Sequence, residues 1–247
     1  MINNFPIINI YEKPKINSKL SSQMLYGEKF KIIYKKGDWL KIKTNYDNYI
    51  GYIQNKKYSK EFNPTFKISS LKSNIYIKRN KRLKKTNKFL YFASRVSKKN
   101  ENKNFLEFEK NRWLKKKDLK KNDYFEKNYN KVYKLFLNSK YLWGGKTARG
   151  IDCSSLIQIY FYYNKTFFPR DTKDQIKFCN YKNKKKFSKG DIIFWKGHVG
   201  MCLNRFKFIH AYGPKKKVLI MPTYFAIELI KKSANLVIKK ISNIKNY

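Results

Sequence analysis

The chain has 247 residues, of which 42% are hydrophobic and 17% aromatic. This is enough apolar material for one large domain or for two to three small ones, and it excludes an intrinsically disordered chain. Lysine and arginine number 58 against 16 acidic residues, so the formal net charge is +42 at pH 7. Two explanations of this charge stay open. One is attraction to polyanions such as nucleic acid, anionic membrane or wall polymers. The other, which we favour, is a compositional bias toward residues with A/T-rich codons.

The cysteines and the start of the chain indicate where the protein acts. Cys153, Cys179 and Cys202 show neither the spacing of a disulfide framework nor that of a zinc site. The first residues lack a basic segment followed by an apolar run, and no window approaches the 18 or so apolar residues of a membrane span. We therefore expect a cytoplasmic protein with no metal, no cofactor, no membrane partner and no specific nucleic-acid partner.

Short strands separated by turn residues dominate the first half of the chain. The pattern predicts strands at 7–11, 21–26, 29–34, 39–44 and 49–54, which suggests a small all-β barrel over residues 1–60. A second strand-rich segment over residues 61–122 resembles a diverged copy, with strands at 65–69, 73–77, 105–109 and 112–114. We expect polar loops at 78–88 and 98–103, and a linker at 120–123.

The third segment, residues 123–247, carries the candidate chemistry. Phe125, Tyr129, Val132, Tyr133 and Phe136 recur at helical spacing and predict an amphipathic helix. A glycine-rich approach then leads to a cysteine at position 153, and the apolar run that follows predicts a buried helix over 154–161. A thiol at a helix N-terminus is expected to favour the thiolate, because the helix dipole and free N–H groups stabilise negative charge.

The two histidines of the chain, His198 and His210, lie in short apolar stretches with strand character. A hairpin with its turn at Asn204-Arg205 would bring their imidazoles side by side. Taken alone, two polar residues at strand ends would be the simpler interpretation. Together with Cys153, the pair suggests a nucleophile and its general base. Cys179 and Cys202 are expected to be packing residues.

Six short motifs follow one another in this third segment. They are Tyr141-Leu-Trp-Gly-Gly145, Ile151-Asp-Cys-Ser-Ser-Leu156, Pro169-Arg-Asp-Thr172 with Gln175, Lys189-Gly-Asp-Ile-Ile-Phe194, Gly197-His-Val-Gly200 and Phe208-Ile-His210. In order and spacing they resemble the NlpC/P60 cysteine peptidases over roughly residues 125–230. The two preceding segments look like the paired bacterial SH3 modules of one branch of that family, the γ-D-glutamyl-L-diamino acid endopeptidases of the dipeptidyl-peptidase VI type.

The resemblance implies an α+β fold, in which a papain-like catalytic domain follows two small all-β SH3-like barrels. It implies Cys153 as nucleophile, His198 as base, His210 as the residue that orients His198, and Tyr141 as an oxyanion ligand together with the Cys153 backbone N–H. Five further residues are implied to face the substrate: Asp152, Ser154, Trp143, Asp171 and Thr172. In this branch an acidic residue, here Asp152, would bind the free amine of an N-terminal L-Ala. Glu28 and Asp38 of the first module are further candidates for that amine pocket.

The implied reaction is hydrolysis of the bond between γ-D-glutamate and diaminopimelate or lysine in a free muropeptide, through a thioester, in peptidoglycan recycling or turnover. Two alternatives stay open. One is a wall- or polyanion-binding protein with a vestigial peptidase fold, suggested by the charge of +42. The other is an exported hydrolase of intact peptidoglycan.

Overall fold

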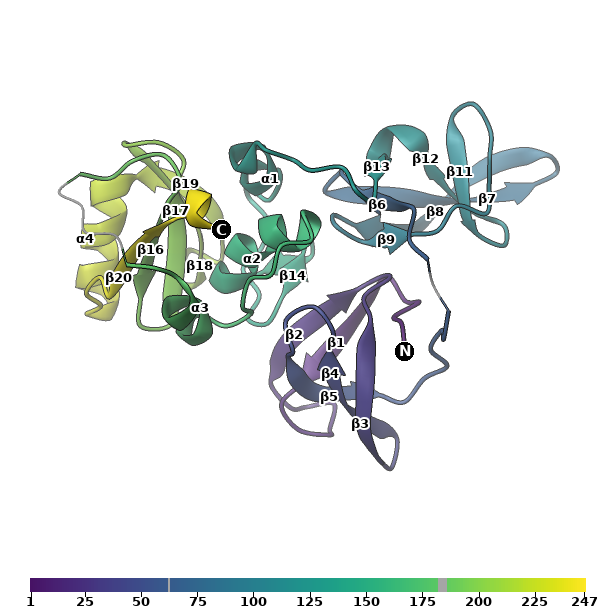
Figure 1. Cartoon of the computed structure of the whole chain (residues 1–247), viewed down its shortest axis with the longest axis horizontal. Helices are drawn as coiled ribbons and strands as arrows, with labels where there is room; N and C mark the ends of the chain where they lie inside the picture. The colour runs from purple at the N-terminus through teal and green to yellow at the C-terminus, as the bar shows by residue number, and fades with distance from the viewer. Residues whose placement is uncertain (62, 182–185) are drawn as a thin grey trace. The chain divides into compact units, whose positions relative to one another are not determined.

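The computed structural model describes residues 1–61, 63–181 and 186–247, and the chain forms two compact units. The first unit comprises residues 1–126 and 146–148, and the second comprises residues 127–145 and 149–247. Figure 1 shows the strand-rich first unit in purple and blue and the mixed helix–sheet second unit in green and yellow. None of the helices in the described part of the chain has the length and hydropathy of a membrane span.

The first five strands form one antiparallel sheet around a small core. They are β1 (Ile7–Tyr11), β2 (Leu20–Leu25), β3 (Phe30–Lys36), β4 (Trp39–Thr44) and β5 (Ile50–Gln54), in the order β2-β1-β5-β4-β3. Alternate residues such as Ile10, Leu40, Ile42 and Ile53 are buried together, as the period of two in a half-buried strand requires. All five strands were predicted, and the observed bounds differ by two residues at most.

The rest of the first unit is also built of strands. These are β6 (Phe66–Ile68), β7 (Lys72–Arg79), β8 (Arg82–Tyr91), β9 (Arg95–Val96), β10 (Asn100–Glu101), β11 (Phe105–Glu109), β12 (Arg112–Lys115) and β13 (Leu119–Lys121), with the 3-10 turn η1 (Lys116–Asp118). They form a five-stranded sheet, β10-β11-β12-β7-β8, and a three-stranded sheet, β13-β6-β9. Tyr26 of the preceding segment packs into their core and its hydroxyl donates to Glu109 at 2.5 Å.

Two predictions for this segment are wrong. Residues 78–88, expected to be a polar loop, form the β7–β8 hairpin, and the expected linker at 120–123 begins inside β13, which pairs with β6. The hairpin was missed because its turn residues, Asn80 and Lys81, adopt positive φ without a glycine. Much of β8 is also exposed, so it lacks the apolar alternation of a half-buried strand.

The second unit places one antiparallel sheet between helices. The sheet has the order β19-β18-β17-β16-β20, with β16 (Asp191–Trp195), β17 (His198–Cys202), β18 (Lys207–Tyr212), β19 (Lys217–Pro222) and β20 (Lys240–Asn243). The helices are α1 (Tyr129–Leu135), α2 (Cys153–Tyr163), α3 (Thr172–Phe178) and α4 (Thr223–Ala234). The short elements β14 (Lys146–Thr147), β15 (Gly150–Ile151), η2 (Gly213–Lys215) and η3 (Ile244–Asn246) complete the chain.

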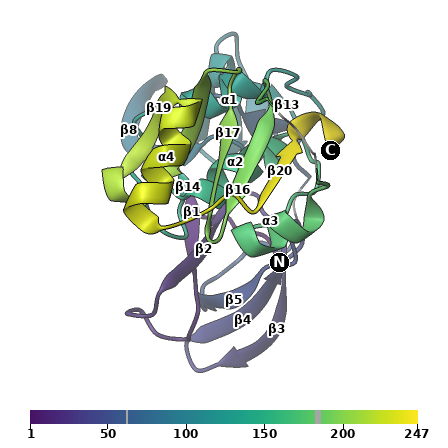
Figure 2. The ribbon, with the colours of Figure 1, turned by 90° about the vertical axis from the view of Figure 1, so that its left-hand side faces the viewer.

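The helices cover the sheet on both faces. In Figure 1, α4 lies on one side of β16–β19 and α2 on the other, and in Figure 2 α4 lies in front of the strands. The α4 side holds Trp195, Phe208 and Ile230 in one core cluster. Every residue of α2 is buried, because this helix packs against α1 as well as the sheet. Helix α1 begins at Tyr129, so Phe125 lies outside the helix and is half exposed.

Candidate active site

Cys153 is the first residue of α2, and its side chain is only 4% exposed. The preceding residue, Asp152, is the N-cap: its carboxylate accepts the backbone N–H of Ser155 at 2.8 Å. This bond ends the extended chain and starts the helix at the cysteine. A Cβ on Gly145 would lie 2.4 Å from the carbonyl oxygen of Gly150, so only glycine allows the chain to approach the helix by this route. The predicted helix after the cysteine is confirmed.

A buried ion pair anchors this helix start. Arg170 donates from both terminal nitrogens to Asp152, at 2.7 and 3.1 Å, and also to the Ser154 hydroxyl at 2.9 Å. Asp152 accepts a further backbone N–H from Gly144 at 2.9 Å. Arg170, Asp152 and Ser154 are each at most 5% exposed. The polar atoms of Asp152 and Ser154 are thus held in place by the protein itself, and the contact of these two residues with the substrate stays a prediction.

Helix α3 is hydrogen-bonded to the start of α2 and to the segment before α3. Gln175 donates from its amide nitrogen to the Ser154 carbonyl at 3.0 Å and to the Pro169 carbonyl at 2.9 Å. Thr172, at the start of α3, is buried, and a hydrogen bond between its hydroxyl and the Cys153 thiol acts to lower the pKa of that thiol. Thr172 therefore contacts the cysteine, and its contact with the substrate stays a prediction.

The two histidines pair as predicted. They lie on neighbouring strands, β17 and β18, and His198 Nε2 is 2.9 Å from His210 Nδ1. The ring of His210 also stacks on Tyr212, with centroids 4.8 Å apart. A Cβ on Gly200 would lie 2.3 Å from the Phe208 ring and 2.9 Å from His210 Cβ, so this glycine makes room for the pair.

The hydrogen bond between the rings constrains their protons. One ring nitrogen of His198 is occupied by His210, which leaves Nδ1 of His198 for another partner. For Nδ1 to accept a proton, Nε2 must carry one and donate it to His210 Nδ1. His210 then holds its own proton on Nε2, a buried atom without a hydrogen-bond partner among the described residues. The pair is thus suited to a neutral base oriented by a neutral neighbour.

Residues on both sides of His198 contact the cysteine. The Cys153 thiol donates to the Gly197 carbonyl at a sulfur–oxygen distance of 3.9 Å, and the Val199 backbone N–H acts on the sulfur to lower the thiol pKa. The start of β17 therefore lies against the start of α2, and the structure places the predicted nucleophile beside the strand that carries the predicted base.

Burial controls the charge state of the site. Desolvation, followed by the Asp152 carboxylate, raises the pKa of Cys153 to about 12, and the opposing effects of Val199 and Thr172 are smaller. Burial likewise lowers the pKa of His198 to about 4, and burial with the neighbouring His198 lowers that of His210 to about 2. Desolvation therefore opposes the stabilisation of the thiolate that is expected at a helix N-terminus, and a thiolate at this position stays a prediction. Burial thus acts in favour of the neutral thiol and of neutral imidazoles.

The remaining predicted residues lie in this unit with different degrees of burial. Burial and the neighbouring Cys153 raise the pKa of Tyr141, which places its hydroxyl within electrostatic reach of the thiol. Trp143 is 51% exposed. Asp171 is the N-cap position of α3 but its side chain makes no capping bond, and partial burial raises the pKa of its carboxyl group.

Arg170 lies within one of the six motifs, but the sequence indicates no role for it. An arginine between a proline and an aspartate gives no periodic signal, and its burial could be inferred only from the carboxylate that it must neutralise.

Glu28 and Asp38 of the first module were further candidates for binding the substrate's amine. Glu28 is 3% exposed, accepts the Leu25 backbone N–H at 2.9 Å and lies 3.5 Å from Lys146 of the first unit. Its carboxylate therefore has a structural partner.

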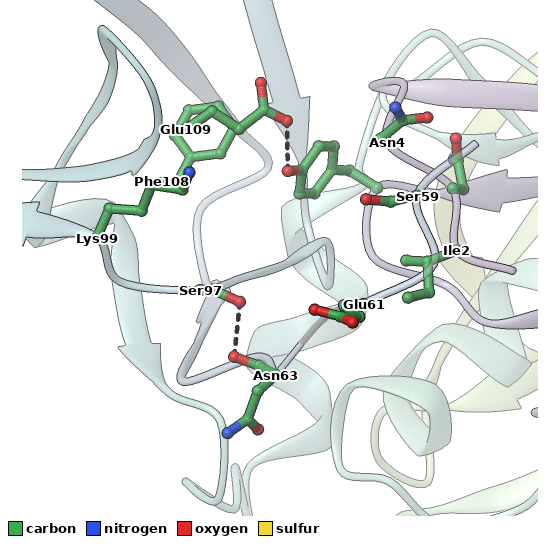
Figure 3. A pocket seen from close by; sticks show the side chains of 11 residues that line it. Ile2, Asn4, Ser59, Glu61, Asn63, Ser97, Lys99, Phe108 and Glu109 are labelled. Atoms are coloured by element: carbon green, nitrogen blue, oxygen red, sulfur yellow. Dashed lines mark hydrogen bonds between the residues drawn. The ribbon is translucent and has the colours of Figure 1, made fainter. Parts of the chain in front are cut away.

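The first unit also contains a cavity that is separate from these residues. It has a volume of about 640 Å³ and is lined by residues including Asn4, Tyr26, Glu61, Lys99 and Glu109. Figure 3 shows Glu109 turned toward the neighbouring phenol ring with the hydrogen bond between them, and Ser97 bonded to Asn63. None of the predicted catalytic residues lines this cavity.

Comparisons with known proteins agree with this arrangement. Residues 138–230 match the NlpC/P60 family, and residues 10–57 match the bacterial dipeptidyl-peptidase SH3 domain. The γ-D-glutamyl-L-lysine dipeptidyl-peptidase of Bacillus cereus is 26% identical over 242 residues, which cover 83% of this chain and 71% of that protein. A probable endopeptidase NlpC homolog of Haemophilus influenzae is 36% identical over 85 residues, and the match spans only 45% of its length.

Solved structures show the same fold. The crystal structure of an NlpC/P60 family protein from Bacillus cereus has a TM-score of 0.78 at 20% identity, covering 90% of this chain and 93% of that one. An NlpC/P60 endopeptidase from Photobacterium damselae has a TM-score of 0.58 at 15% identity, covering 95% of this chain and 69% of that one. The α+β class, with SH3-like strands before an NlpC/P60 domain, is confirmed. The division of residues 1–122 into two SH3 modules stays a prediction.

Proposed function

We propose that the chain cleaves peptidoglycan-derived peptides as a cysteine peptidase, because residues 138–230 match the NlpC/P60 family and residues 10–57 match the bacterial dipeptidyl-peptidase SH3 domain. The bond is that between γ-D-glutamate and a diamino acid, diaminopimelate or lysine, in peptides with a free N-terminal L-Ala. The observation that carries the proposal is the pairing of His198 with His210 at 2.9 Å beside a cysteine that begins a helix. The reaction would serve the recycling or turnover of wall peptides.

The proposed chemistry starts from a neutral thiol. When substrate enters, His198 Nδ1 takes the proton of the Cys153 thiol as the sulfur attacks the glutamyl carbonyl carbon. The charge that develops on the carbonyl oxygen is bound by the Cys153 backbone N–H, which has no intrahelical acceptor at this position, and by the Tyr141 hydroxyl. His198 then protonates the leaving amine, a thioester forms, and water hydrolyses it with His198 as base.

The substrate's free amine needs a carboxylate that the protein does not already use. Asp152, the ligand that the resemblance implies, is already bonded to Arg170, Ser155 and Gly144. Asp171 is partly buried, makes no capping bond and follows Arg170 directly. We assign the ammonium group to Asp171, and we assign the substrate peptide to the exposed ring of Trp143.

The first test is mass spectrometry of L-Ala-γ-D-Glu-diaminopimelate, and of its lysine counterpart, after incubation with the protein. We expect the wild type to release L-Ala-D-Glu, and Cys153→Ala to release none. Acetylation of the substrate's N-terminus should abolish release. If no peptide is cleaved, the wall- or polyanion-binding alternative is favoured. If the acetylated peptide is cleaved equally well, an endopeptidase of intact peptidoglycan is favoured.

The amine ligand has its own test. Asp171→Asn should lower kcat/KM for the free-amine peptide about 10- to 100-fold, because a charge-assisted hydrogen bond contributes roughly 1.5–3 kcal/mol. Asp174→Asn, in the first turn of the same helix α3, is the matched control and should change kcat/KM little. Equal losses in the two variants would contradict the assignment of Asp171.

A further inference from the structure

One outer surface of the first five-stranded sheet combines lysines with exposed apolar side chains. Strand register places Lys41 between Tyr52 and Tyr34, and Lys43 between Ile50 and Lys31, on the side opposite the core residues Leu40 and Ile42. We call this surface the β3–β5 face and define it by Lys31, Ile33, Tyr34, Lys41, Lys43 and Ile50. Strand β3 is the edge of the sheet, and Ile33 is the extra residue of a bulge in it.

The lysines of the β3–β5 face repel one another. Lys31 and Lys43 are direct cross-strand partners, an arrangement in which like charges destabilise a sheet. None of the ion pairs formed by the described residues involves Lys31, Lys41 or Lys43. The outward-facing residues of β3, β4 and β5 also include no carboxylate. The surface is therefore complementary to an anionic partner.

The exposed apolar side chains of the β3–β5 face indicate which class of anionic partner binds it. Ile33 is 49% and Ile50 52% exposed, and Tyr34 beside Ile33 is 41% exposed. A phosphate polymer or a nucleic-acid backbone offers these aliphatic groups no apolar environment. The ammonium of Lys41 lies 5.4 Å from the Tyr34 ring centroid and 5.8 Å from that of Tyr52, so a nucleobase stacking there would have to displace it. A lipid surface, in contrast, takes both lysines and aliphatic groups.

We propose that the β3–β5 face docks on the surface of a membrane rich in anionic phospholipid. The lysine ammonium groups meet headgroup phosphates, while Ile33 and Ile50 enter the boundary between headgroups and acyl chains. Tyr34 and Tyr52, whose hydroxyls are 2.7 Å apart, present a polar end and an apolar ring, as aromatic residues at membrane interfaces do. The sequence predicts no membrane partner because it contains no spanning segment, and a peripheral surface needs none.

The test is co-sedimentation of the full chain with sucrose-loaded vesicles of phosphatidylcholine alone, or of phosphatidylcholine mixed with phosphatidylglycerol. We expect binding to the mixed vesicles only. The double variant Lys31→Gln/Lys43→Gln should weaken it about 30-fold, since a lysine near an anionic surface contributes about 1 kcal/mol. Ile33→Ser/Ile50→Ser should weaken it roughly tenfold. Lys84→Gln/Lys85→Gln, which removes two exposed lysines of β8, is the charge-matched control and should bind like the wild type.

Several results would overturn the proposal. The proposal fails if the protein sediments equally well with neutral and with mixed vesicles. It also fails if Lys84→Gln/Lys85→Gln loses as much binding as Lys31→Gln/Lys43→Gln. Retention of full binding by Ile33→Ser/Ile50→Ser would leave only a polyanion site. Competition by a single-stranded oligonucleotide or a poly(glycerol phosphate), at lower phosphate concentration than the vesicles require, would point to those polymers instead. Circular dichroism of each variant checks that it folds, and a salt titration of wild-type binding gives the electrostatic share without any substitution.

Discussion

The β3–β5 face and the surroundings of Cys153 differ in how their charged groups are paired. On the face, lysines stand beside one another at the surface without carboxylates. At the site, the Arg170 guanidinium is buried and every oxygen of its partner Asp152 accepts a hydrogen bond. The comparison teaches that the net charge of +42 describes the surface, whereas the site depends on a few buried polar groups whose charges are matched or suppressed.

The largest effect is expected from breaking the buried pair. Arg170→Met would leave the Asp152 carboxylate buried without its cation, and such losses destabilise proteins by about 3–5 kcal/mol. Urea unfolding followed by circular dichroism measures the change. The double variant Arg170→Met/Asp152→Leu removes both charges and should recover part of the stability. A change below about 1 kcal/mol for the single variant would show that the pair is not essential to this unit.

The second prediction concerns pH. The folded pKa of His198, about 4, lies below its ordinary value of 6.5, so the unfolded chain binds the proton first. Stability from this residue is present above pH 6.5 and is lost as pH falls toward 4, by about 3 kcal/mol in total. His198→Gln should make the fall in unfolding free energy over this range about half as steep, because His210, whose folded pKa is about 2, still contributes. An equally steep fall in the variant would mean that His198 does not titrate in this way.

The third prediction tests the space that allows the histidine pair. Gly200→Ala would bring a methyl group 2.3 Å from the Phe208 ring, and overpacking of this kind costs about 1–3 kcal/mol. Because the same methyl group approaches His210, we also expect peptidase activity to fall under conditions in which the variant is still folded. Gly37→Ala in the first sheet meets no atom within 4 Å and serves as a steric control, although its positive φ adds a small strain. Full activity in Gly200→Ala would contradict the role of this glycine.

The smallest effect belongs to the surface. Lys43→Gln removes one of two like charges that face each other across β3 and β4, so it should raise the unfolding free energy by roughly 0.2–1 kcal/mol. Added salt should reduce the difference, because it screens the repulsion in the wild type. A stabilisation that persists unchanged at high salt would have another cause.

Sequence patterns predicted the elements whose local signals agree with their burial. Strand β4 alternates buried and outward residues, α2 follows a good N-cap, and the histidine hairpin has two apolar strands around a turn. The β7–β8 hairpin was missed because it is held by pairing with little burial. The thiol's raised pKa and the function of Arg170 also escaped prediction. The first arises from desolvation and the second from the ion pair with Asp152, and both depend on residues brought together by the fold, which no local pattern records.

The suppressed ionisation of Cys153 has a consequence for the protein's chemical durability. Peroxide oxidises thiolates far faster than thiols, and it attacks exposed sulfur faster than buried sulfur. Cys153 is only 4% exposed and burial raises its pKa to about 12, so it offers the oxidant neither a thiolate nor an exposed sulfur atom. The desolvation that opposes ionisation of this sulfur therefore also makes it a slow target for peroxide.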